Sequence, residues 1–252
     1  FAQAIFQLGG NLGSALAPLL VILIILGKRS SGSVLIEETH LEKLIWFVLF
    51  PAVAILILFF IGNWRKKLLK KAQTTSKREI PLPDLTHAQI RNSVIILMLL
   101  VFSKNFYTAG ISNYFQFYTL EKFGFSHAQA QLYLFYYLGA AAAGTLIGGF
   151  FGDRVGRKFI IWFSILGTAP FALWLPYADA DTTAILVILI GFIISSAFAS
   201  ILVYSQELLP KKIGMISGVF YGFAFGMGGL ASALLGKLID LTDITFVYKV
   251  CS

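Results

Sequence analysis

The chain has 252 residues, of which 58% are hydrophobic and 13% are charged, whereas roughly a quarter of the residues are charged in soluble domains. A soluble core of this size could not bury so much apolar side chain, so the composition excludes an ordinary soluble domain and predicts an integral membrane protein. The net charge is +8. A positive charge of this size could indicate nucleic-acid binding or the orientation of a membrane protein, and the distribution of the charges along the chain distinguishes the two.

Seven apolar runs predict membrane-spanning helices, because each approaches the roughly 20 residues that an α-helix needs to cross about 30 Å of hydrocarbon. Transmembrane β-barrels show alternating segments of roughly ten residues instead, and these runs are continuous, so we expect an all-α fold. In chain order the runs cover about 3–27, 44–63, 92–118, 128–150, 159–178, 183–206 and 213–239.

The one long polar connection, 64–91, separates two runs from five and begins at Trp64, a typical interfacial anchor. Thirteen of the 20 Lys and Arg residues lie on the side of this connection, six lie on the opposite side, and one lies inside a run. Positive charge accumulates on the cytoplasmic side of membrane proteins. We therefore expect a multi-pass protein of the inner (plasma) membrane with 64–91 in the cytoplasm, and no nucleic-acid partner.

The sequence offers no pattern for metal, redox or catalytic chemistry. Its single cysteine, Cys251, cannot close an internal disulfide, and the three histidines lie far apart in the chain. A membrane-embedded enzyme would need paired acids, a nucleophile with a base, or a metal cluster. We expect no cofactor, no metal and no enzymatic activity, and an embedded enzyme is the weakest alternative.

A charged loop between the fourth and fifth runs has the pattern G-x-x-x-D-R-x-G-R-K. Its residues are Gly149, Gly152, Asp153, Arg154, Gly156, Arg157 and Lys158. Arginines can fork onto carboxylates, and glycines let helix ends approach closely, so the pattern predicts an ionic latch. A topogenic stop signal would explain the arginines, but neither Asp153 nor the glycine spacing. Glu207, at the end of the sixth run, is a candidate ion partner for Arg157 or Arg154, or a solvated carboxylate.

This motif, in a short loop between two spans, resembles the loop signature of the major facilitator superfamily, and the similarity to bacterial drug exporters of that family covers nearly the whole chain. The resemblance implies twelve spans in two six-helix bundles. The seven runs then correspond to spans five to eleven of an incomplete bundle. On this interpretation 1–63 holds the last two helices of the N-terminal bundle, 64–91 is the linker, and 92–252 is the C-terminal bundle without its last helix.

The resemblance also implies a function: secondary active export of a small anionic drug by alternating access, driven by protons, with the charged loop as the cytoplasmic gate. A carrier for an anionic metabolite is the alternative. The expected partners are the small-molecule substrate, protons and the lipid bilayer, and no oligomer is required.

Lys104 is the only ionisable residue well inside an apolar run. A lysine at the bilayer centre costs about 2.5–3.5 kcal/mol, so it should face a cavity. At helical spacing it shares a face with Tyr107 and Tyr114, while Asn105 lies elsewhere around the same span. We predict that these four residues take part in substrate binding or coupling. The alternatives are that Lys104 pairs with an acid outside this sequence or snorkels to the interface. The proton-carrying group would be such an outside acid or Lys104 itself.

Glycines recur every four residues in two of the runs. Small residues at this spacing let helix backbones touch in lipid. We expect them to serve helix packing, with a sliding surface between bundles as the functional alternative. They are Gly144, Gly148 and Gly152 in the fourth run, and Gly214, Gly218, Gly222 and Gly226 in the seventh.

Overall fold

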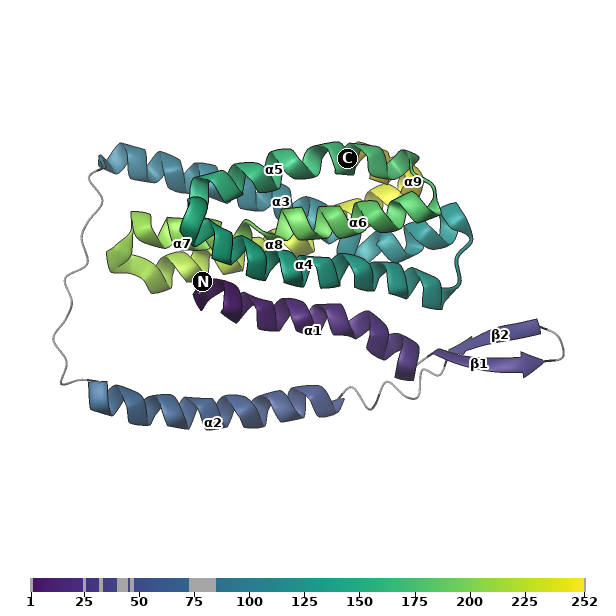
Figure 1. Cartoon of the computed structure of the whole chain (residues 1–252), viewed down its shortest axis with the longest axis horizontal. Helices are drawn as coiled ribbons and strands as arrows, with labels where there is room; N and C mark the ends of the chain where they lie inside the picture. Colours follow the sequence, from purple (N-terminus) through teal and green to yellow (C-terminus); the bar gives the residue numbers. More distant parts are fainter. Residues whose placement is uncertain are drawn as a thin grey trace. The chain divides into compact units, whose positions relative to one another are not determined.

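The computed structural model describes residues 2–24, 26–31, 34–39, 45, 48–72 and 85–251 (Figure 1). The chain forms two compact units. The first combines Phe1–Leu19 with Leu82–Ser252, and the second is Leu20–Pro81. The first unit is therefore built from both ends of the chain, and it holds every site discussed below.

Helices make up the first unit, and they follow the apolar runs of the sequence. They are α1 (Ala2–Ile24, of which the part up to Leu19 belongs to this unit), α3 (His87–Phe123), α4 (His127–Val155), α5 (Arg157–Trp174), α6 (Ala180–Ser195), α7 (Phe198–Leu208), α8 (Ile213–Leu241) and α9 (Ile244–Cys251), with short 3-10 turns at Leu175–Tyr177 and Pro210–Lys212. Both α3 and α4 begin at a capping box, in which Gln89 and Gln129 accept from the backbone N–H of Thr86 and Ser126.

Within the described residues, six helical segments are long and apolar enough to cross a membrane. They cover Ala2–Ile24, His87–Phe123, His127–Val155, Arg157–Tyr177, Ala180–Leu208 and Pro210–Leu241. The second predicted run, 44–63, is helical from Leu49 as part of α2 (Leu49–Ala72) but is not among these six. The all-α membrane fold is thus confirmed, and a seventh span stays a prediction.

The second unit adds a β-hairpin to α2. Strands β1 (Leu26–Ser31) and β2 (Val34–Thr39) pair antiparallel, with Leu26 opposite Thr39 and Ser31 opposite Val34. The sequence predicted an apolar run to about residue 27 and a polar connection after it, so the hairpin was not predicted. An antiparallel hairpin pairs many of its backbone groups between its own two strands, so it can form in the mainly polar segment that follows α1.

Helix α3 carries two separate apolar clusters, one toward each end. The first includes Leu97 and Val101, which pack with side chains of α5, α7 and α8. The second includes Ile111 and Phe115, which pack with side chains of α4, α6 and α9. Lys104 lies in the stretch of α3 between these clusters. The fold therefore leaves the middle of α3 free of the tightest apolar packing.

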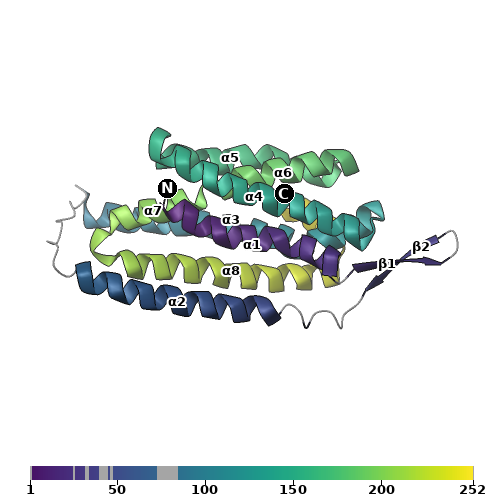
Figure 2. The ribbon, with the colours of Figure 1, turned by 60° about the horizontal axis from the view of Figure 1, so that its bottom comes forward.

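Glycines bring α4 and α6 into direct backbone contact, and the two helices lie side by side in Figures 1 and 2. A Cβ at Gly144 would overlap the backbone of Phe192, and one at Gly148 would overlap that of Ser196. In contrast, a Cβ at any of the four predicted packing glycines of α8 would meet no described atom within 4 Å; these are Gly214, Gly218, Gly222 and Gly226. Their packing role stays a prediction.

The sixth apolar run is one span in length but two helices in structure. It breaks at Ser196 and Ala197, between α6 and α7. Hydroxyl groups satisfy the carbonyls near the break: Ser196 Oγ donates to Ile193 O at 2.7 Å, and Ser164 Oγ of α5 donates to Ile194 O at 3.0 Å. Such bonds replace those of a continuous helix and let a span be interrupted inside a membrane.

Candidate functional site

The charged loop between α4 and α5 is a turn built around Gly156. Helix α4 ends at Val155 and α5 begins at Arg157, and Gly156 between them has φ 111° and ψ 135°. An L side chain rarely adopts such a positive φ, whereas glycine does so at little cost. Gly156 therefore lets the two helices follow each other with one residue between them, and Arg157 comes within reach of Asp153.

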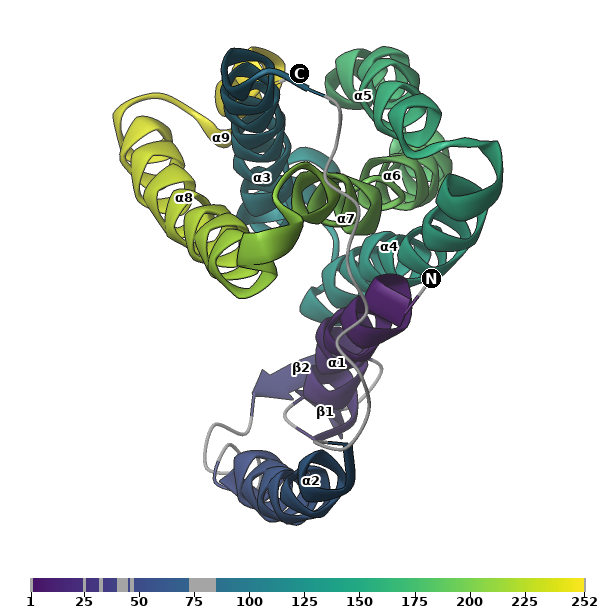
Figure 3. The same cartoon turned by 90° about the vertical axis from the view of Figure 1, so that its left-hand side faces the viewer.

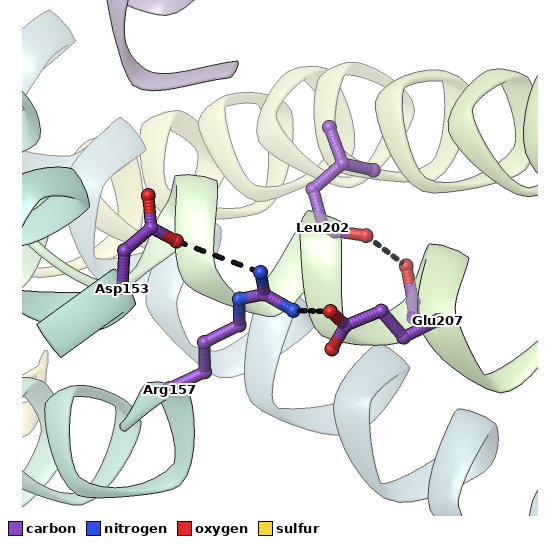
Figure 4. Close-up of polar contacts among 5 residues, drawn as sticks. Asp153, Arg157, Leu202 and Glu207 are labelled. Carbon is purple, nitrogen blue, oxygen red and sulfur yellow. Dashed lines mark hydrogen bonds and ion pairs between the residues drawn. The ribbon is translucent and has the colours of Figure 1, made fainter. Parts of the chain in front are cut away.

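Arg157 joins this turn to the end of α7 (Figure 4). Its Nη1 contacts Glu207 Oε1, and its Nη2 donates to Asp153 Oδ1 at 3.5 Å. The Arg157 side chain is 22% exposed, compared with 54% for Glu207. A planar guanidinium can serve two carboxylates at once. We call Asp153, Arg157 and Glu207 the ionic cluster, and it links α4, α5 and α7.

The other two cations of the motif have different surroundings. The Arg154 guanidinium carbon lies 4.1 Å from the centre of the Phe150 ring, and Lys158 Nζ lies 5.8 Å from the centre of the Tyr204 ring. The sequence left open which arginine meets Glu207, and in the structure it is Arg157. A cavity of about 290 Å³ adjoins the ionic cluster.

The first two glycines of the motif allow close approach of other helices to α4. A Cβ at Gly152 would lie 2.5 Å from Ser200 Oγ of α7. A Cβ at Gly149 would overlap the side chain of Ala4 of α1. Larger side chains at these positions would push both neighbours away from the turn, so the motif's glycines fix the geometry around its charges.

The second candidate site surrounds Lys104, whose Nζ is buried and has no hydrogen-bond partner among the described residues. The ammonium lies 5.7 Å from the centre of the Phe198 ring, at the start of α7. A ring face can attract a cation but accepts no strong hydrogen bond from it. The three N–H donors of Lys104 are thus left for another group.

Lys104 lies between two cavities of different character. A polar cavity of about 300 Å³ is lined by Lys104 together with Gln7, Asn11, Asn105, Thr108, Tyr137 and Thr145, among others. An apolar cavity of about 600 Å³ is lined by Lys104 together with Leu100, Tyr107, Ile165, Ile194 and Leu235, among others. No Asp or Glu of the described chain lines either cavity. An anion in reach of Lys104 would therefore meet no like charge from these walls.

The structure separates the four residues that the sequence grouped around Lys104. Asn105 lines the polar cavity, where its amide donates to Val101 O at 2.8 Å. Tyr107 lines the apolar cavity. The Tyr114 hydroxyl donates to Ser232 O of α8 at 2.6 Å, which makes it a contact between helices. Of these four residues, Lys104 and Asn105 line the polar cavity, and Tyr107 and Tyr114 do not.

Sequence reasoning missed the polar side chains that α1 contributes. Asn11 Nδ2 donates to Thr145 Oγ1 of α4 at 2.7 Å, and Gln3 Nε2 donates to Tyr221 OH of α8 at 2.7 Å. Gln7 lies between them on the same helix and lines the polar cavity. The signal was present, because Gln3, Gln7 and Asn11 recur every four residues and so share one face of an apolar helix.

No set of three or more His, Cys, Asp or Glu side chains in the described ranges is arranged to hold a metal ion. The two sites are thus an ionic contact at one end of the bundle and a buried cation beside a small polar cavity near the middle of α3.

The sequence profile described as Major Facilitator Superfamily matches residues 1–233. The chain belongs to the major facilitator superfamily. It therefore comes from a family of transporters that is generally not enzymatic, and it is a multi-pass membrane protein. The motif around Asp153 and the run order had indicated this family from the sequence.

Comparison with curated proteins shows which members of the family this chain resembles. The chain is 50% identical to the fosmidomycin resistance protein of Escherichia coli, over all of this chain and 59% of that protein. It is 37% identical to YfnC, an uncharacterised MFS-type transporter of Bacillus subtilis, over 97% of this chain and 58% of that protein. It is 26% identical to the cis,cis-muconate transport protein of Acinetobacter baylyi, over 79% of this chain and 49% of that protein. The chain thus spans between about half and three fifths of the length of these relatives.

Proposed function

We propose that the complete transporter exports a small anionic drug, such as fosmidomycin, from the cytoplasm in exchange for protons. The observation that carries the proposal is the buried Lys104 ammonium, which lines a polar cavity without a carboxylate from the described chain. A hydrogen bond between a charged donor and an anion contributes roughly 1.5–3 kcal/mol. The E. coli relative is named for resistance to fosmidomycin, which supports the choice of this drug.

The ionic cluster is the proposed cytoplasmic gate. It joins the α4–α5 turn to the end of α7, so it stabilises whichever state holds these three helix ends together. Arg157 is mostly buried whereas Glu207 is half exposed, and such a contact is weak enough to break during each cycle. The excess of Lys and Arg on the side of 64–91 supports a cytoplasmic position for this loop and an inner-membrane location for the protein.

Proton coupling needs a group that gains and loses a proton during the cycle. Within the described residues the cavity walls supply no carboxylate, and Lys104 is their one amine. The proton carrier in this proposal is therefore Lys104 or an acid that lies outside the described residues. In the first case the substrate anion and the proton meet at the same nitrogen.

A second candidate function is a carrier for an anionic metabolite. It is favoured by the name of the A. baylyi relative, since cis,cis-muconate is a dicarboxylate. Lys104 would serve this function equally well, because it binds a carboxylate and a phosphonate by the same charge. The two functions differ in which anion, when it is transported, causes protons to move in exchange.

The test uses the complete transporter in inside-out membrane vesicles, with a dye that reports the lumenal pH. Adding fosmidomycin should release protons from the lumen, and Lys104→Ala should abolish this release. Lys237→Ala, the same change at an exposed position on α8, is the matched control and should behave as the wild type. Proton movement with a dicarboxylate but not with the phosphonate would favour the metabolite carrier, and no movement with either would contradict both.

A further inference from the structure

The polar cavity is lined by three residues whose buried polar atoms have no hydrogen-bond partner among the described residues: Lys104, Gln7 and Tyr137. The Tyr137 hydroxyl can donate or accept, whereas the other two atoms have opposite and fixed characters. Lys104 Nζ, from α3, can only donate, and Gln7 Oε1, from α1, can only accept. Figure 3 shows α1 lying against α4. Buried polar groups are nearly always paired in folded proteins, so three unpaired ones around a single cavity point to a ligand.

Several other polar groups of the same wall already have partners. The Asn11 amide donates to Thr145, the Thr145 hydroxyl donates to Ala141 O at 2.9 Å, and the Tyr221 hydroxyl accepts from Gln3. Asn105 donates to its own helix. These bonds hold the wall in place, and they leave the Gln7 acceptor, the Lys104 donors and the Tyr137 hydroxyl for a molecule inside the cavity.

We propose that Gln7 is a specificity-determining residue of the substrate site, and that the site prefers small organic anions that also carry an O–H or N–H donor. The anionic group binds Lys104, and the separate donor binds Gln7 Oε1. This inference rests on the proposed function, which makes Lys104 the anion site. The cavity volume of about 300 Å³ is at the lower end for ligand pockets, which suits a compact molecule.

The chemical reason for selection is the acceptor itself. An anion without a donor would satisfy Lys104 but would leave Gln7 Oε1 buried and unpaired, as in the empty cavity. An anion with a donor would satisfy both groups. A neutral hydrogen bond of this kind corresponds to about fivefold in affinity.

The experiment measures binding of three phosphonates of similar length to the purified complete transporter by calorimetry. The probes are 3-hydroxypropylphosphonate, which donates and accepts, 3-methoxypropylphosphonate, which only accepts, and butylphosphonate, which does neither at its tail. The wild type should bind the hydroxyl probe about fivefold more tightly than the other two. In Gln7→Met, which keeps the side-chain length but removes the acceptor, the three affinities should become equal, with that of butylphosphonate unchanged.

Gln131→Met is the matched control, because the Gln131 amide on α4 already donates to Gln116 and the residue lines neither cavity. It should keep the preference for the hydroxyl probe. If Gln7→Met fails to fold, Gln7→Leu tests the same point, and retained butylphosphonate binding reports an intact site. A preference that survives the loss of Gln7, or no preference in the wild type, would overturn the proposal.

Failure of the proposed function would look different. Lys104→Ala should lower the affinity for all three probes to the same extent, roughly 10- to 100-fold. Unchanged binding in this variant would remove Lys104 from the site and contradict the proposed function, whatever Gln7 does. Normal weakening by Lys104→Ala with no effect of Gln7→Met would leave the proposed function intact and overturn this inference alone.

Discussion

The guanidinium of Arg157, at the first position of α5, contacts the carboxylate of Glu207 near the end of α7, and the same guanidinium also bonds to Asp153 at the end of α4. One side chain therefore joins three helix ends. If this contact gates the cytoplasmic side, weakening it should change how the transporter moves between states more than how it binds substrate.

Asp153→Asn should reduce transport severalfold while leaving the substrate Kd within about twofold, because the change removes one of two charges facing Arg157 but touches no residue of the polar cavity. Initial rates in vesicles and calorimetric binding measure the two quantities separately. Arg154→Gln is the control, since Arg154 stacks on Phe150 instead. Equal losses in binding and transport would show that Asp153 does not act on the state equilibrium.

Charge exchange across the ionic pair gives a stricter test. Glu207→Arg alone puts two guanidinium groups together and should impair transport by about tenfold, and adding Arg157→Glu in the same protein should restore a large part of the rate. Exposed pairs contribute about 0.2–1 kcal/mol, so the rescue should be partial. Transport that stays low in the double variant, with normal expression, would argue against a direct Arg157–Glu207 contact in the working cycle.

Lys122 should stabilise the opposite end of the bundle. Its Nζ donates to Pro176 O and Ala178 O at 2.8 Å each and to Tyr118 OH at 2.9 Å, so it satisfies carbonyls in the connection between α5 and α6. Lys122→Met should lower the stability by about 1–3 kcal/mol, seen as a lower melting temperature in detergent. Substrate affinity should not change, since Lys122 lines neither cavity, and an unchanged melting temperature would contradict this role.

Gly144→Ala should destabilise the protein because the new methyl group would overlap the backbone of α6 at Phe192. Overpacking of this kind costs about 1–3 kcal/mol. Gly139→Ala, on the same helix, is the matched control, because its Cβ would lie 3.9 Å from the Phe135 ring, an ordinary contact. Thermal unfolding of both variants in the same detergent decides the matter: equal melting temperatures would mean that α4 and α6 are not in backbone contact.

Local patterns in the sequence were sufficient to predict some of these features. Lys104 stood out because a charge inside an apolar run needs a cavity, and the loop around Asp153 stood out by its spacing. The choice of Arg157 over Arg154 was not predictable, since both lie in one loop and the partner comes from α7. The break at Ser196 was also hidden, because the apolar run continues through it and the hydroxyl from Ser164 that satisfies a carbonyl there comes from another helix.

The lining of the polar cavity could not be predicted without the tertiary structure. Helical spacing placed Tyr107 and Tyr114 on the same face as Lys104. In the structure, however, the Tyr114 hydroxyl donates to a backbone carbonyl of α8, and Tyr107 lines the apolar cavity. The polar wall comes instead from α1 and α4, including Gln7 and Thr145. Periodicity within one helix cannot reveal which neighbouring helix covers which face.

The most direct test of the central claim is the affinity of the purified complete transporter for fosmidomycin, measured for the wild type, Lys104→Ala and Lys237→Ala at one pH and salt concentration. We expect Lys104→Ala to weaken binding roughly 10- to 100-fold, while the exposed-lysine control Lys237→Ala binds as the wild type does. Equal affinity in all three folded proteins would contradict the claim that Lys104 holds the substrate anion.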